Sequence, residues 1–152
     1  MADRIPEPYE KFRSQIKNWV IEERCQFTPT KGKDWAWAYT VTKEDHTPFT
    51  VFQYNGRPES LFISAIADLS DYQQLFNGLT EREQREFVLS LRIALTHLDV
   101  EFDVAENLSQ INMLRQMFLE DMTRTVFWDK VFSMNKAMLT VAWKVETRIP
   151  LP

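Results

Sequence analysis

Residues 34–42 alternate between bulky and small side chains, and this pattern constrains the fold more than any other part of the sequence. Successive side chains of a β-strand point to opposite faces of its sheet. The alternation therefore predicts a strand with one bulky face and one slim face. The bulky face carries Trp35, Trp37, Tyr39 and Val41.

A hairpin is predicted soon after this strand. Residues 49–54 are rich in aromatic and β-branched side chains, which favour strands, and Asn55 and Gly56 follow them. An Asn-Gly pair is typical of a two-residue type I′ turn, in which both residues have positive φ. The next strand should then pair back at once, with Phe49 opposite Phe62. In that register, large apolar side chains point to both faces of the sheet.

Apolar residues at steps of three and four predict helices at both ends of the chain. The first helix is expected from Tyr9 through Phe27, ended by Pro29 and Gly32. The last helix follows Thr123, a good N-cap residue, and has the longest apolar stripe in the sequence. That stripe consists of Phe127, Val131, Met134, Met138, Val141 and Val145.

The middle of the chain is expected to hold two helices and two strands. A short helix ends at Gly78, and a longer one begins where Thr80 and Glu83 can form a capping box. Residues 100–104 alternate apolar and acidic side chains, which is typical of a strand. Residues 111–119 suit a strand and a helix equally well by spacing, and we interpret them as a strand.

These elements predict an α+β fold. We expect a bent antiparallel sheet of about five strands with flanking helices, in the order α-βββ-α-ββ-α. The sequence has no internal repeat, low-complexity tract or linker, so residues 1–152 are expected to form a single domain. A chain of this length can bury a core without disulfides.

The charge balance and the hydropathy exclude several classes of partner. The chain has 18 basic and 22 acidic residues and a net charge of −4, whereas nucleic-acid binding depends on basic residues that neutralise phosphates. No segment approaches the ~20 apolar residues of a membrane helix. Residues 1–8 lack the apolar core of a secretory signal. We therefore expect a cytoplasmic protein with neither a nucleic-acid nor a membrane partner.

Few residues in the sequence are candidates for catalysis or for metal binding. Cys25 is the only cysteine, and together with His46 and His97 it is too small a set for a zinc site. Cys25 and His97 are both expected near helix ends, and His46 in a solvated acidic turn. The three glycines are isolated, so no phosphate-binding loop or nucleophile elbow is present. The sequence predicts no catalytic residue, no metal site and no cofactor, and it indicates a protein that is not an enzyme.

Aromatic residues make up 13% of the chain. Such residues are enriched where proteins contact partners, and they also fill protein cores. Two candidate partner-binding surfaces follow: the bulky face of the 34–42 strand and one side of the last helix. Their residues are Trp35, Trp37, Tyr39, Phe127, Trp128, Phe132 and Met138. The alternative role for these side chains, and the commoner one, is core packing.

The order of elements resembles the type III secretion chaperone-like fold. Two segments are similar to a small bacterial family of unknown function with this fold: the opening helix, and residues 118–123 leading into Phe127 and Val131. In the opening helix the likeness is carried by Ile16, Trp19, Val20, Glu22 and Glu23. The resemblance covers nearly the whole chain. It implies a small acidic homodimer that holds a segment of another protein against apolar grooves.

The leading hypothesis is therefore a non-enzymatic protein-binding module, chaperone-like or an assembly factor, that acts as a homodimer. One alternative is a small-molecule-binding protein or enzyme with a pocket between the sheet and the terminal helix. Another is an assembly subunit whose exposed apolar surface is only its dimer interface. The partner itself is left open.

Overall fold

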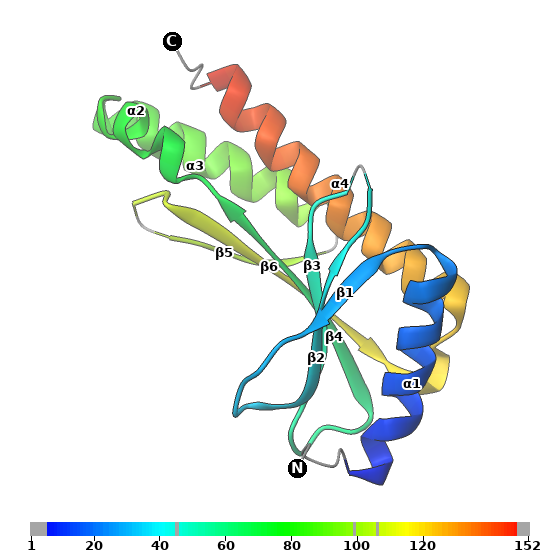
Figure 1. Cartoon of the computed structure of the whole chain (residues 1–152). Coiled ribbons are helices and arrows are strands. Elements are labelled where there is room, and N and C mark those ends of the chain that lie inside the picture. Colours follow the sequence, from blue (N-terminus) through cyan, green and yellow to red (C-terminus); the bar gives the residue numbers. More distant parts are fainter. Residues whose placement is uncertain (1–5, 45, 99, 106, 149–152) are drawn as a thin grey trace. The chain divides into compact units, whose positions relative to one another are not determined.

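The computed structural model describes residues 6–44, 46–98, 100–105 and 107–148 (Figure 1). The helices are α1 (Glu7–Glu22), α2 (Gln73–Asn77), α3 (Glu81–Thr96) and α4 (Arg124–Arg148), with short 3₁₀ turns at Ser70–Tyr72 and Leu119–Asp121. The strands are β1 (Gln26–Pro29), β2 (Trp35–Thr42), β3 (Phe49–Tyr54), β4 (Ser60–Asp68), β5 (Glu101–Val104) and β6 (Gln110–Phe118). They form one sheet in the order β1-β2-β3-β4-β6-β5, and the pairs β1–β2, β2–β3, β3–β4 and β5–β6 are antiparallel. The predicted α+β class with an antiparallel sheet is confirmed.

The residues group into two compact units. Unit 1 consists of Met1–Ser64 and Gln116–Asp129, and unit 2 of Ala65–Arg115 and Lys130–Pro152. The expectation of a single domain stays a prediction.

The first helix is shorter than the sequence indicates. It ends at Glu22, and Phe27 lies in a further strand, β1, so the sheet has six strands rather than about five. Arg24 has a positive φ of 59°, which turns the chain out of the helix, and Phe27 then pairs with Val41 of β2. The prediction was wrong here because Phe27 lies seven residues after Val20, a spacing that fits a continuing helix equally well.

The hairpin between β3 and β4 also differs from its prediction. Phe62 lies opposite Phe52 and not opposite Phe49, so the register is shifted by three residues. Gly56 has a positive φ of 82°, but the residue before it does not, so the turn is not type I′ and the loop covers residues 55–59. The rings of Phe52 and Phe62 stack with their centroids 5.6 Å apart.

A buried amide holds this wider loop. Gln53 is fully buried in β3, and its Nε2 donates to the backbone oxygens of Pro58, at 3.1 Å, and Ser60, at 3.3 Å. Its Oε1 accepts a hydrogen bond of 2.7 Å from Nε1 of Trp37 on β2. Burial of a polar side chain is tolerated where its hydrogen bonds are satisfied. This network fixes the β3–β4 connection and the neighbouring part of β2.

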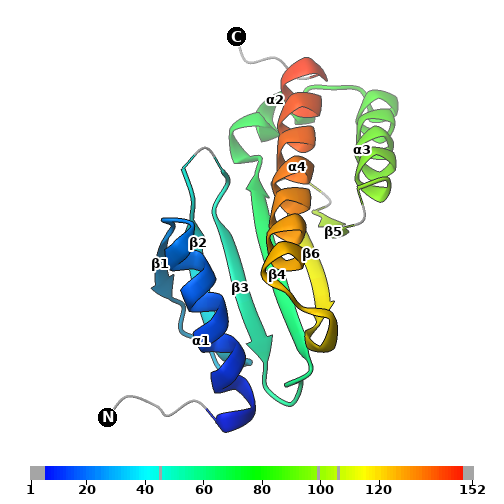
Figure 2. The same cartoon turned by 90° about the vertical axis from the view of Figure 1, so that its right-hand side faces the viewer.

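Unit 1 packs α1 against the strands. Ile16, Trp19 and Val20 are buried on one side of the helix, which lies along β1 and β2 (Figure 2). The first turn of α4 completes this core, because Phe127 is fully buried and its ring lies 5.7 Å from that of Trp19.

Unit 2 contains α2, α3, most of α4, β5 and the part of β6 that pairs with β5. Residues 110–118 are a strand, as predicted, and Phe102 of β5 pairs with Met113 of β6. The predicted capping box of Thr80 and Glu83 starts α3. The predicted apolar stripe of α4 is buried along its whole length, and α3 runs beside α4 (Figure 2).

Candidate functional site

Helix α3 carries exposed apolar side chains opposite its buried stripe. Phe87, Leu91 and Leu95 are buried, whereas Leu89 and Ile93 are 58% and 52% exposed. Each residue advances roughly 100° around a helix, so positions 89 and 93 lie on the side away from the stripe. They are one turn apart and form a continuous apolar ridge, which we call the α3 ridge.

Leu89 lines two neighbouring grooves. The first has a volume of about 500 Å³ and extends along α3 to the end of α2. Its lining residues are Phe76, Glu81, Gln84, Arg85, Val88, Leu89 and Arg92. The second has a volume of about 340 Å³ and is lined by Glu86, Leu89, Ser90, Ile93, Ala94 and Lys144. The α3 ridge therefore stands beside open apolar space on a helix that is otherwise polar outside.

Side-chain hydrogen bonds hold the walls of these grooves in place. Nε2 of Gln84 donates to the backbone oxygens of Phe76, at 3.0 Å, and Leu79, at 3.3 Å, and so fixes the end of α2 against α3. Nζ of Lys144 on α4 donates to Oγ of Ser90 on α3 at 3.0 Å. Preformed walls lower the ordering cost of binding a ligand.

The charges at the first groove favour an acidic ligand. Arg85 and Arg92 stand against a single carboxylate, Glu81, so the lining has one net positive charge. Arg85 and Glu81 form an ion pair of 3.2 Å, but both side chains are largely exposed, and such pairs contribute little. The groove can thus accept an apolar segment that carries a carboxylate next to the arginines.

The described part of the chain offers no group of His, Cys, Asp and Glu side chains that could hold a metal ion. Among the described helices, none is both long enough and apolar enough to span a membrane. The groove linings consist of apolar, amide, hydroxyl and charged side chains, with no histidine or cysteine among them.

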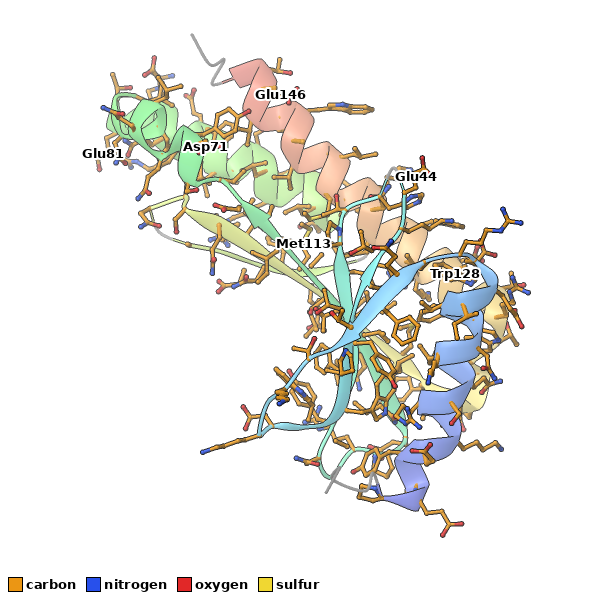
Figure 3. All side chains as sticks on the ribbon, in the orientation of Figure 1. Glu44, Asp71, Glu81, Met113, Trp128 and Glu146 are labelled. Carbon is orange, nitrogen blue, oxygen red and sulfur yellow. The ribbon has the colours of Figure 1, made fainter. Side chains whose placement is uncertain are left out.

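A second exposed surface lies on the outer face of α4. Leu139 is 45% exposed, and Trp143, at 67%, is the most exposed large apolar side chain among the described residues. Lys136 and Glu146 are exposed on the same face, and Glu146 lies near the C-terminal end of the helix (Figure 3). This face is opposite the buried stripe of α4.

The strand residues predicted to bind a partner lie inside unit 1. Trp37 and Tyr39 are buried, and Trp35 is half-buried with its Nε1 donating to the backbone oxygen of Thr30 at 3.1 Å. The hydroxyl of Tyr39 accepts a hydrogen bond of 2.6 Å from Nη1 of Arg13 on α1. The bulky face of β2 is therefore covered by the protein's own side chains. This arrangement agrees with core packing, the alternative role considered for these residues.

The predicted residues of the last helix are divided between core and surface. Phe127, Trp128 and Met138 are buried, whereas Phe132 is 46% exposed. The ring of Trp128 has Nζ of Lys43 5.9 Å from its centroid, at the end of α4 that adjoins α1 (Figure 3). Among the seven predicted residues, Phe132 alone presents a largely exposed side chain, and the binding roles of all seven stay predictions.

The residues considered for chemistry do not line either groove. Cys25 lies between α1 and β1 rather than inside the first helix, because that helix ends three residues earlier. Partial burial raises the pKa of its thiol, which disfavours the nucleophilic thiolate. His46 is in the β2–β3 loop, and its Nδ1 lies 3.0 Å from the backbone oxygen of Glu44. His97 directly follows α3, as predicted.

The α3 ridge was not among the residues that the sequence singled out, although a sequence signal for it exists. Leu89 and Ile93 are apolar positions outside the stripe of Phe87, Leu91 and Leu95 on a helix with strong start signals. The same test would have found Trp143 on the last helix. An apolar residue on the polar side of an amphipathic helix is a better guide to an exposed surface than a high aromatic content.

Comparisons with known proteins identify relatives without assigning an activity. Residues 12–145 match the family described as uncharacterized conserved protein (DUF2299). A crystal structure of an uncharacterized protein from Methanothermobacter thermautotrophicus is similar, with a TM-score of 0.85 and 19% identity over 90% of this chain and 98% of that chain. This likeness shows the fold. No curated protein matches the chain.

A second solved structure is more distant. A chain in the crystal structure of the ExsC–ExsE complex is similar with a TM-score of 0.46 and 16% identity, over 94% of this chain and 91% of that chain. At this score the likeness assigns no function. The expectation of a family of unknown function is confirmed, and the bacterial source that the resemblance implied stays a prediction.

Proposed function

The chain belongs to the DUF2299 family, and we propose that it is a non-enzymatic, chaperone-like protein-binding module that works as a homodimer. The observation that carries this proposal is the α3 ridge. Leu89 and Ile93 are both more than half exposed and stand beside two grooves whose exposed surface is mainly apolar. Contiguous exposed apolar surface of this kind marks interaction sites in soluble proteins.

The occupant we propose is an apolar segment of another protein with at least one acidic residue. Leu89 and Ile93 can meet apolar side chains of the segment, as in other helix-in-groove complexes. Arg85 and Arg92 can pair with its carboxylate. A small-molecule pocket between the sheet and the terminal helix stays the alternative.

The occupant can be recovered by photo-crosslinking and then tested as a pure peptide. A photo-crosslinking amino acid is placed at Glu81 of the full chain, which lines the first groove and is not one of the arginines expected to bind the carboxylate. The experiment uses the cells that naturally contain the protein, and the crosslinked segment is identified by mass spectrometry. A synthetic copy of that segment should bind the purified chain. The Leu89→Asp/Ile93→Asp variant should raise its dissociation constant by at least about tenfold, because buried apolar anchors dominate such interfaces.

The matched control is Ile21→Asp, which also places a carboxylate at a half-exposed apolar position but on α1. It should leave the dissociation constant unchanged. If the synthetic segment does not bind the purified chain, or binds the α3 variant as tightly as wild type, the α3 ridge is not a partner site and the proposal fails.

A further inference from the structure

The exposed face of α4 has a symmetric pattern of side chains. Lys136, Leu139, Trp143 and Glu146 are all exposed and follow one another at steps of three, four and three residues. We call these four residues the α4 seam. Steps of three and four place them along one line of the helix, the spacing by which two helices pack side by side. The seam spans about 15 Å of helix.

This pattern is self-complementary. If two α4 helices pack antiparallel about a two-fold axis level with Val141, position 139 faces position 143 and position 136 faces position 146. Leu139 of each copy then packs on Trp143 of the other, and Lys136 of each copy meets Glu146 of the other. Two apolar pairs are thus flanked by two pairs of opposite charge. A two-fold interface requires such a surface, in which each residue finds its complement on the same patch.

We propose that the α4 seam is the homodimer interface, with a second copy of the chain docked antiparallel on it. This inference rests on the homodimer part of the proposed function and gives it a location. Charge complementarity selects both the occupant and its direction. Parallel packing would place Lys136 against Lys136 and Glu146 against Glu146, and juxtaposed like charges oppose association.

The test is the solution mass of the full chain by light scattering, combined with charge reversal. Wild type should show twice the 18.1 kDa mass of one chain. Lys136→Glu places carboxylates on both sides of each charged pair, and Glu146→Lys places ammonium groups there. Each single variant should raise the dimer dissociation constant by about tenfold or more. The Lys136→Glu/Glu146→Lys double variant restores opposite charges and should return the constant to near its wild-type value.

Two further variants test the apolar centre. Trp143→Asp should yield a folded monomer, with its helix content checked by circular dichroism. Ile93→Asp is the matched control, since it changes another exposed large apolar side chain, on α3, and should remain a dimer. A monomeric wild type would overturn both the interface and the homodimer. A dimer that is insensitive to the charge reversals would overturn the α4 interface alone, and the binding test of the α3 ridge is independent of either result.

Discussion

Phe127→Ala is expected to lower the free energy of unfolding by about 4 kcal/mol, the usual range for a truncated core phenylalanine. The side chain is fully buried, and its ring lies 5.7 Å from that of Trp19 and 5.1 Å from that of Trp128. The cavity left behind would be lined by these large rings, which cannot collapse into it without moving α1. Urea denaturation followed by circular dichroism measures the change.

Phe132→Ala is the control for this prediction. It removes the same atoms from the same helix, but at a side chain that is 46% exposed, so a loss of about 1 kcal/mol or less is expected. The comparison separates two roles that the sequence left open for the aromatic residues of this helix. A loss at Phe127 no larger than that at Phe132 would contradict the core position of Phe127.

Gln53→Leu is expected to cost about 3 kcal/mol of stability, although leucine has a similar size and is more apolar. The reason is the set of hydrogen bonds that the amide makes while fully buried. Leucine would leave the indole N–H of Trp37 and the backbone oxygens of Pro58 and Ser60 without this partner. Each buried group that loses its partner costs about 1–3 kcal/mol.

A double-mutant cycle isolates the Trp37–Gln53 hydrogen bond. Trp37→Phe removes the indole N–H, so the Trp37→Phe/Gln53→Leu variant no longer buries an unsatisfied donor there. Its loss of stability should be smaller than the sum of the two single losses by about 1–2 kcal/mol. Strictly additive losses in urea denaturation would show that the two side chains do not interact.

Local signals in the sequence predicted several elements correctly. Alternation identified β2, the capping box of Thr80 and Glu83 identified the start of α3, and the long apolar stripe identified α4. In each case one physical requirement, a period or a cap, determines the local structure by itself. These elements give the α+β class before any tertiary contact is known.

The wrong predictions concern two segments whose local structure is determined by tertiary contacts. The chain leaves α1 at Arg24 because β1 can pair with β2, a contact distant in sequence from the helix it interrupts. The hairpin register is set by the buried amide of Gln53 and not by the Asn-Gly pair alone. The amino-acid sequence from Asn55 to Glu59 is compatible with both a two-residue turn and a five-residue loop.

The candidate surface was harder to predict than the fold. Trp37 and Tyr39 have the composition of a recognition surface, but hydrogen bonds to Gln53 and from Arg13 place them in the interior of unit 1. Exposure depends on which faces the rest of the chain covers, and composition does not contain that information. Leu89 and Ile93 are distinguished by their exposure and not by their residue type, since no other described part of the chain covers them.

Carbene footprinting of the full chain, free and with the segment recovered by crosslinking at Glu81, shows where that segment binds. Photogenerated carbene labels accessible side chains, so Leu89 and Ile93 should be labelled in the free protein and protected in the complex. We expect this protection to be centred on α3. Unchanged labelling of Leu89 and Ile93, with protection at the half-buried Trp35 and along β2 instead, would contradict it and return the partner site to the aromatic strand.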